Sequence, residues 1–180
     1  AMKSNKKFDL GLIRNHYVGR TFIEPTQNIR SLGVKLKLSS TKTIVKNKSL
    51  ILIDDSLVRG TTCFKIVKML YEAGAKEVHV RIACPEIKFP DFYGVDMPTK
   101  EELLAHEKDL SEMCKYIKAT SLKFLSLEGL YKALAGAKRN LNYPQFSDHY
   151  FTGDYPIKPT DSLQGLKIKQ LSLLSIKSSS

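Results

Sequence analysis

Apolar residues along the chain occur in short unbroken runs and in helically spaced positions, an order that is typical of α/β folds. Residues 50–53 form an apolar run that is too short to cross a membrane and is typical of a strand buried on both faces of a parallel sheet. From Thr62 the apolar residues follow helical spacing, and Gly74 stands where a left-handed residue commonly ends a helix. These positions are Cys63, Ile66, Val67, Leu70 and Ala73. The pattern predicts a buried strand followed by a helix.

A second strand is predicted directly after this helix. Val78, Val80 and Ile82 alternate with polar residues, and the breaker Pro85 follows. Because a helix separates the two strands, we expect them to be parallel neighbours joined by a right-handed crossover.

The alternation continues toward the carboxyl end. Thr99 and Glu102 have the spacing of a capping box, which predicts a helix with Leu103, Leu110 and Ile117 on one face. Residues 122–125 are expected to form another short strand, and Ser126 to cap a helix that runs through Leu134.

Composition fits one domain with a core of ordinary size, since 42% of the 180 residues are apolar and 26% are charged. The net charge of +11 favours anionic partners, but it is spread over the chain, so we expect no nucleic-acid face. Three cysteines without a Cys-x-x-Cys pattern indicate a reducing compartment. Without a signal peptide or a long apolar run, the expected location is cytoplasmic, with no membrane contact.

Asp54 and Asp55 follow the first predicted strand directly. In open α/β sheets, ligands bind beyond the carboxyl ends of the strands, so both acids are expected at the floor of a site. Two adjacent carboxylates repel each other unless a divalent cation or hydroxyl donors offset their charge. A sugar diol supplies such donors.

Residues 56–62, which we call loop 56–62, offer successive backbone amides, and the hydroxyls of Thr61 and Thr62 lie at the start of the predicted helix. Together with the helix dipole, these groups suit a phosphate dianion. A plainer interpretation is that the acids end a strand and that Gly60 makes a turn. The chain has neither a Gly-x-Gly-x-x-Gly nor a Gly-x4-Gly-Lys-Ser/Thr motif, which argues against a dinucleotide fold or a triphosphate loop.

Residues 14–37 carry five cations and one acid among turn-forming residues. We interpret this stretch as a mobile lid over the ligand, with Arg14, Tyr17, Arg20 and Lys37 as candidate ligand contacts. The alternative is an ordinary solvated loop.

Four motifs resemble a known family. Residues 50–62 resemble the 5-phosphoribosyl-1-pyrophosphate signature of type I phosphoribosyltransferases. Together with residues 11–23, 93–98 and 151–156, they are similar to the synthetase half of the amidophosphoribosyltransferases, and the similarity runs from about residue 10 to 157.

The resemblance implies a type I phosphoribosyltransferase fold, with a mostly parallel sheet and helices on both faces. We expect a partial domain over residues 8–158, incomplete at its amino-terminal side, and a basic, serine-rich tail of uncertain order over residues 159–180. The family's glutaminase half begins with a cysteine, whereas the first cysteine here is Cys63, so glutamine hydrolysis is not expected of this chain.

The implied reaction replaces the pyrophosphate of 5-phosphoribosyl-1-pyrophosphate with ammonia at carbon 1, which gives 5-phosphoribosylamine in the first step of purine synthesis. Asp54 and Asp55 would hold the ribose hydroxyls directly or through magnesium. Loop 56–62 would bind the 5′-phosphate; its members are Ser56, Leu57, Val58, Arg59, Gly60, Thr61 and Thr62. The family also implies purine nucleotides as feedback ligands and a homo-oligomeric complete enzyme.

Some family members carry an iron–sulfur cluster, but the matching positions here hold Asp91, Ser147 and Tyr150, so no cluster is expected. Cys63, in the first turn of its helix, would be partly activated at most. Two other functions remain open: a phosphoribosylpyrophosphate-sensing purine regulator that binds nucleic acid, and a phosphoribosyltransferase that uses a purine base.

Overall fold

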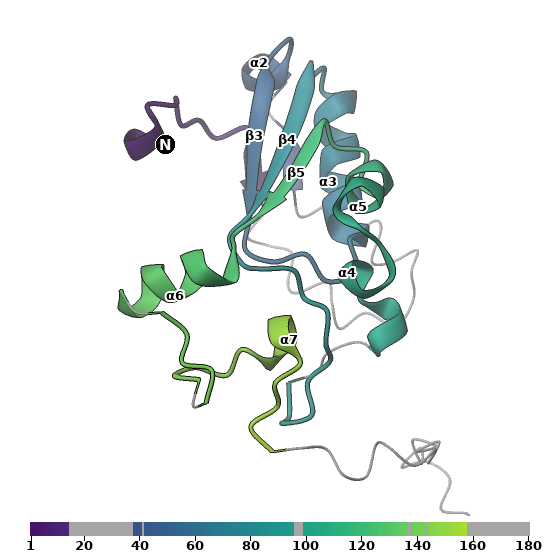
Figure 1. The fold of residues 1–180 in the computed structure, drawn as a ribbon. Coiled ribbons are helices and arrows are strands. Elements are labelled where there is room, and N and C mark those ends of the chain that lie inside the picture. Colours follow the sequence, from purple (N-terminus) through teal and green to yellow (C-terminus); the bar gives the residue numbers. More distant parts are fainter. Residues whose placement is uncertain (15–37, 41, 96–98, 137, 143, 158–180) are drawn as a thin grey trace, which may run out of the picture.

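The computed structural model describes residues 1–14, 38–40, 42–95, 99–136, 138–142 and 144–157, and the account below concerns these residues (Figure 1). The amino-terminal elements are η1 (Met2–Ser4), β1 (Leu12–Arg14), β2 (Leu38–Ser40), α2 (Lys42–Val45), β3 (Ser49–Asp54), α3 (Thr61–Glu72) and β4 (Glu77–Ile82). The elements that follow are η3 (Lys100–Glu102), α4 (Leu104–Glu107), α5 (Leu110–Tyr116), β5 (Ser121–Phe124), α6 (Leu127–Ala135) and α7 (His149–Thr152).

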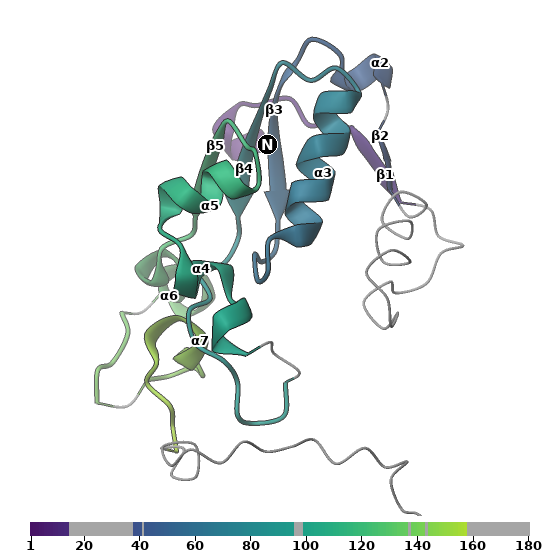
Figure 2. The same cartoon turned by 90° about the vertical axis from the view of Figure 1, so that its right-hand side faces the viewer.

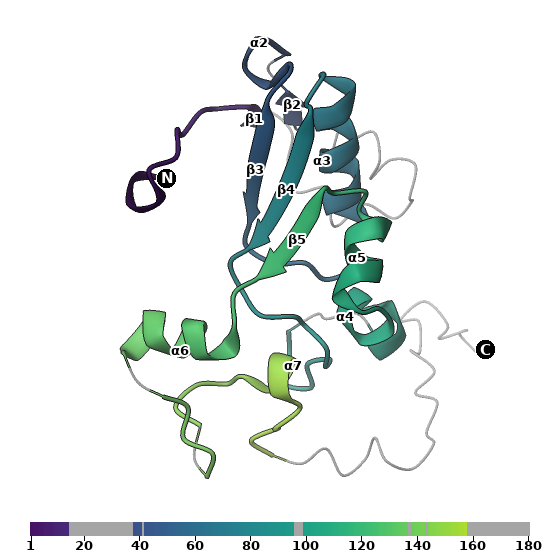
Figure 3. The same ribbon diagram turned by 45° about the horizontal axis from the view of Figure 1, so that its top comes forward.

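The main sheet is parallel, with its strands in the order β3-β4-β5. Asp54 is in register with Ile82, and Ile82 with Phe124, so the carboxyl ends of the three strands lie at one edge. Helices α6 and α7 lie beyond that edge (Figures 1 and 3). The predicted strands and their parallel pairing through α3 are confirmed.

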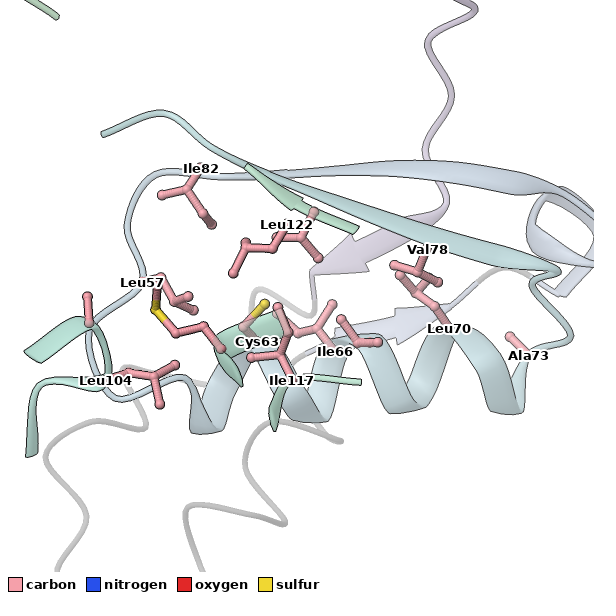
Figure 4. Close-up of a cluster of buried hydrophobic side chains, with 14 of the residues drawn as sticks. Leu57, Cys63, Ile66, Leu70, Ala73, Val78, Ile82, Leu104, Ile117 and Leu122 are labelled. Carbon is pink, nitrogen blue, oxygen red and sulfur yellow. The ribbon is translucent and has the colours of Figure 1, made fainter. Parts of the chain in front are cut away.

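The core lies between one face of this sheet and the helices α3 and α5 (Figure 4). Every third or fourth residue of α3 points into it, as the spacing predicted: Cys63, Ile66, Val67 and Leu70 are buried. From the sheet, Val78, Val80 and Ile82 of β4 and Leu122 of β5 meet them. Helix α3 ends at Glu72, and the left-handed Gly74 (φ 95°) follows two residues later.

The prediction that the strand at 50–53 is buried on both faces is wrong. Leu50 and Leu52 pack against the core, but the side chains of Ile51 and Ile53 on the opposite face are 50% and 69% exposed. The described helices α3 and α5 cover only the first face (Figures 1 and 3). A run of apolar residues indicates a strand, but burial of its second face depends on other elements packing there.

The single helix predicted after Thr99 is also wrong, because three short helices (η3, α4 and α5) replace it. Thr99 makes no side-chain cap, and the backbone is extended at Leu103 (ψ 112°) and Lys108 (ψ 142°). A reciprocal capping box forms ten residues later, where Asp109 and Glu112 cap each other's backbone amides at the start of α5. The break allows Leu103 and Leu104 to become buried.

The carboxyl-terminal strand and helix follow their predictions closely. β5 is parallel to β4, and Ser126 caps α6 by accepting a hydrogen bond from the Gly129 amide at 3.0 Å. A small antiparallel pair, β1 with β2, was not predicted. It lies on the α3 side of the molecule (Figure 2), and Leu12 of β1 packs against the core.

Within the described residues, none of the helices combines the length and the apolar character that crossing a bilayer requires.

Candidate functional site

The two adjacent acids lie at the carboxyl end of β3, as expected. Asp54 is the last residue of the strand and is partly buried, whereas Asp55 is exposed. A carboxylate oxygen of Asp54 accepts a hydrogen bond from the Asp55 amide at 3.1 Å, and Asp55 accepts one from the Ser56 hydroxyl at 2.9 Å. Among the described residues, no Lys, Arg or His forms an ion pair with either acid.

The electrostatics of this pair reflect an uncompensated negative charge. Burial raises the pKa of Asp54, the Asp55 amide partly offsets that rise, and the charge of Asp55 raises the pKa further. A cation or a set of hydroxyl donors at this position would offset the repulsion between the two ionised carboxylates. Among the described residues, no group of three or more His, Cys, Asp or Glu side chains is placed so that it could hold a metal ion.

Loop 56–62 leads from the acids into the amino terminus of α3. Gly60, with φ 75°, is the N-cap residue that precedes this 12-residue helix. No side chain of the described residues caps the helix there, and its first turn contains no acid. Among the described residues, the backbone amides of Arg59, Gly60, Thr61 and Thr62 have no hydrogen-bond partner. These open amides at a helix amino terminus form an arrangement that binds anions.

Other groups of loop 56–62, apart from its open amides, are held in place by packing and by a backbone hydrogen bond. The side chain of Leu57 is buried beside Cys63 and Leu104 at the loop end of α3 (Figure 4). The carbonyl of Val58 accepts a hydrogen bond from the Leu104 amide at 2.9 Å. At Gly60 a Cβ would lie 2.7 Å from the Leu104 side chain and 3.0 Å from that of Tyr116, so only glycine fits without rearrangement. The site is thus braced by residues that are distant in the sequence.

Arg59, a predicted ligand contact, forms an ion pair through its side chain. Its guanidinium donates to the Glu102 carboxylate at 3.0 Å, and both side chains are about half exposed. The side chain is therefore occupied by an ion pair, although the Arg59 amide stays open. Neither Glu102 nor Leu104 was singled out as a site residue, because nothing in the sequence marks residues more than 40 positions away as neighbours of this loop.

Most of the predicted lid lies outside the described residues. This applies to Tyr17, Arg20 and Lys37, whereas Arg14 is the last residue of β1. The pairing of β1 with β2 brings Arg14 and Leu38 opposite each other.

Two cavities open elsewhere on this side of the molecule, and neither includes the acid pair or loop 56–62. The larger one, of about 440 Å³, lies between β5, α6 and residues 85–88. The smaller one, of about 250 Å³, is lined by Asp91, Tyr93, Val95, Ser147, His149, Tyr150, Pro156 and Ile157. All three residues that match cluster positions in the resembling family, Asp91, Ser147 and Tyr150, therefore surround this smaller cavity.

Asp91 is the centre of that smaller cavity's hydrogen-bond network. Its carboxylate accepts from the Nε2–H of His149 and from the amides of Tyr93 and Val95 at 2.8 to 2.9 Å. Burial alone would raise the pKa of Asp91, but these donors and the Tyr150 hydroxyl outweigh it and lower the pKa to about 2. The network joins the loop after β4 to α7, and the Lys88 and Phe89 amides strengthen the link by donating to the Tyr150 carbonyl.

A second buried network fixes the segment before α7. Arg139 pairs with Asp148 and with Asp154, and the Tyr131 hydroxyl donates to Asp148 at 2.7 Å. Burial raises the pKa of Asp148, but the hydrogen bonds from Arg139 and Tyr131 outweigh this effect, so the net pKa is lowered. These contacts link Tyr131 of α6 and Arg139 to Asp148, which immediately precedes α7, and to Asp154, which follows it.

Burial makes the thiols of Cys63 and Cys84 harder to ionise. Cys63 is buried, and burial together with the charge of Asp54 raises the pKa of its thiol to about 12, which stays within the expectation that this thiol is partly activated at most. Burial and the nearby charges of Asp55 and Asp54 likewise raise the pKa of Cys84 to about 11. All three cysteines are free thiols.

Comparison with known proteins identifies close relatives of one kind, although no protein-family model matches the chain. The chain is 55% identical over 176 residues to the amidophosphoribosyltransferase of Rhizobium etli, covering 97% of this chain and 36% of the relative. It is 51% identical over 161 residues to amidophosphoribosyltransferase 1, chloroplastic, of Arabidopsis thaliana, covering 89% and 28%. A solved structure of glutamine phosphoribosylpyrophosphate amidotransferase from B. subtilis, complexed with ADP and GMP, superposes with a TM-score of 0.69 at 49% identity, covering 82% of this chain and 32% of that one. The chain therefore spans about a third of the length of the relatives that it matches.

Proposed function

We propose that this chain, which is homologous to one region of the amidophosphoribosyltransferases and has their α/β phosphoribosyltransferase fold, binds 5-phosphoribosyl-1-pyrophosphate as part of such an enzyme. In the proposed reaction ammonia attacks carbon 1 of the ribose, the bond from carbon 1 to pyrophosphate breaks, and the products are 5-phosphoribosylamine and pyrophosphate. The observation that carries the proposal is that Asp54 and Asp55, which form no ion pair with any described residue, lead directly into loop 56–62 and the amino terminus of α3, where no side chain of the described residues caps the helix.

Each end of the substrate has a matching group. The 5′-phosphate would accept hydrogen bonds from the open amides of residues 59–62 and gain from the positive end of the α3 dipole. The hydroxyls on carbons 2 and 3 would donate to the carboxylates of Asp54 and Asp55, which supply acceptors only. One sugar phosphate thus satisfies both halves of the site at once.

The chemistry of this reaction requires charge stabilisation more than proton transfer. Departure of pyrophosphate leaves positive character on the ribose ring and negative charge on the leaving group. The carboxylates of Asp54 and Asp55, on the ribose side, would favour the developing positive charge, and the fixed ring and phosphate would hold carbon 1 in place for attack. Arg14, Tyr17, Arg20 and Lys37 stay proposed contacts for the pyrophosphate.

Magnesium fits this donor set. It is commonly held by one or two carboxylates together with oxygens of a phosphorylated substrate and water, and Asp54 and Asp55 are such a pair. When bound, magnesium would neutralise negative charge on the pyrophosphate. We propose no iron–sulfur cluster, since Asp91 is already engaged by three hydrogen bonds to protein groups.

Purine nucleotides are the proposed feedback ligands. The B. subtilis relative was solved with ADP and GMP. A purine nucleoside monophosphate carries a 5′-phosphate and a ribose diol, so it can occupy the same acids and amides as the substrate. We therefore propose that nucleotide and substrate compete directly for this site. We also propose that the complete enzyme is a homo-oligomer and is cytoplasmic.

Binding of 5-phosphoribosyl-1-pyrophosphate with magnesium in a titration calorimeter tests the proposal. Wild-type chain should bind, and Asp55→Asn should lose at least tenfold in affinity, because a hydrogen bond to a charged acceptor contributes about 1.5–3 kcal/mol. Glu128→Gln on α6 is the matched control, since Glu128 is exposed in the first turn of that helix. Equal affinities of Asp55→Asn and wild type would refute the assignment, and product analysis with ammonia against adenine would separate it from a base-specific transferase.

A further inference from the structure

We infer that Glu102 is a positioning residue for loop 56–62 and acts through the guanidinium of Arg59. The inference rests on the proposed function, because it assumes that the open amides of this loop receive the phosphate of the substrate. Glu102 belongs to η3, which precedes α4, and it is 43 residues away from Arg59 in the sequence.

Three successive loop residues are held from one side by a single short segment. Val58 accepts a hydrogen bond from the Leu104 amide at 2.9 Å, and Arg59 donates to Glu102 at 3.0 Å. Gly60 lies so close to Leu104 that a Cβ would approach its side chain to 2.7 Å. Residues 102–104 therefore contact the backbone or side chain at each position where the chain turns from the acids into α3.

Of these three contacts, only the Arg59–Glu102 pair can be removed without cutting the backbone or emptying the core. The Val58 bond uses main-chain atoms, and Leu104 is buried. The side chains of Arg59 and Glu102 are 49% and 51% exposed, so their pair adds little to global stability. It can nevertheless restrict the loop, since it ties down the residue between the two other contacts.

The orientation of Arg59 bears directly on the amides. With its guanidinium on Glu102, the Arg59 side chain is directed to η3 while its amide stays unpaired. If that side chain were released, the peptide groups next to it could rotate. The amides of residues 59–62 would then point toward one anion in a smaller fraction of the molecules. Because only molecules with converging amides bind the anion, the apparent affinity falls in proportion to their fraction.

A contrary model makes the opposite prediction. If Arg59 were itself a phosphate ligand that Glu102 withholds, the removal of Glu102 would release the guanidinium and tighten binding. The sign of the change in affinity therefore separates a positioning role for Glu102 from competition with the ligand.

The experiment titrates ribose 5-phosphate, and separately inorganic phosphate, into the full 180-residue chain with Glu102→Gln. We expect affinity for ribose 5-phosphate to fall about two- to fivefold, the range of an exposed ion pair, with an unchanged melting temperature. Glu101→Gln is the matched control, because Glu101 is the adjacent exposed acid of η3 and, among the described residues, makes no hydrogen bond or ion pair to loop 56–62. Unchanged or tighter binding by Glu102→Gln overturns the inference.

A charge swap provides the second measurement. Arg59→Glu combined with Glu102→Arg restores an ion pair in reverse, so it should bind more tightly than either single substitution if the pair acts as a brace. If the swap binds no better than Arg59→Glu alone, the inference is overturned. Failure of the wild-type chain to bind ribose 5-phosphate would refute the proposed function and the inference together, whereas equal affinity of wild type and Glu102→Gln would refute the inference alone.

Discussion

Substitution of Gly60 by alanine should destabilise the fold through two separable costs. The backbone of Gly60 is left-handed, with φ 75°, which costs a residue with a Cβ about 1–2 kcal/mol. The added Cβ would also lie 2.7 Å from the Leu104 side chain and 3.0 Å from that of Tyr116. Overpacking of this kind costs about 1–3 kcal/mol, so the free energy of unfolding of Gly60→Ala should fall by about 2–5 kcal/mol.

Gly136→Ala is the control that isolates the contact. Gly136 at the end of α6 has φ 65°, but among the described residues, apart from its chain neighbours and the backbone of α6, no heavy atom lies within 4 Å of a Cβ built there. Urea unfolding followed by circular dichroism should give a loss of about 1–2 kcal/mol for Gly136→Ala, and a larger loss for Gly60→Ala. Equal losses for the two variants would show that Leu104 and Tyr116 do not press on the loop, which would refute the reasoning about how loop 56–62 is held.

Two further predictions concern groups outside the loop. Asp91→Asn should cost about 3–5 kcal/mol, because it removes the charge of a buried pair with His149. The folded-state pKa of Asp91 is about 2, below its ordinary value of 3.8, so the carboxylate stabilises the fold above pH 4 and that contribution is lost as the pH falls toward 2. Parallel pH profiles of wild type and Asp91→Asn in urea unfolding would contradict this linkage. Cys63, buried and with a thiol pKa of about 12, should react with a thiol reagent at pH 8 only after unfolding, and rapid labelling of native Cys63 in a mass-mapped assay would contradict its assigned burial.

The order of elements could be predicted because periodicity is a local property. The spacing of Cys63, Ile66 and Leu70 specifies one face of α3, and the alternation of Val78 and Val80 specifies a strand with one core face. What covers the other face of a strand is not local, which is why the exposure of Ile53 was missed.

The break of the helix after Thr99 shows a local signal overruled by a tertiary contact. The stretch between β4 and β5 contains two capping-box patterns, one beginning at Thr99 and one at Asp109, and only the second forms. At the first, the extended backbone of Leu103 brings the Leu104 amide to the Val58 carbonyl. A propensity of about 1 kcal/mol for a cap is easily outweighed by such a contact together with burial of a leucine.

In the candidate site, too, some residues could be predicted from the local sequence and others could not. Asp54 and Asp55 were identified because they are contiguous with the strand and loop that position them. The pairing of Arg59 with Glu102 could not be found from the sequence, because scattered surface charges carry no mark of their partners. Residues that shape a site from a distance are visible only once the chain is folded.

Phosphate binding by loop 56–62 is tested most directly by an amide-resolved NMR titration of the chain with ribose 5-phosphate. If loop 56–62 and the start of α3 bind the phosphate, the largest changes in amide chemical shift should fall on Gly60, Thr61 and Thr62, with smaller ones at Asp54 and Asp55. If those five amides do not move while residues around Asp91 do, the ligand binds elsewhere and the account is wrong.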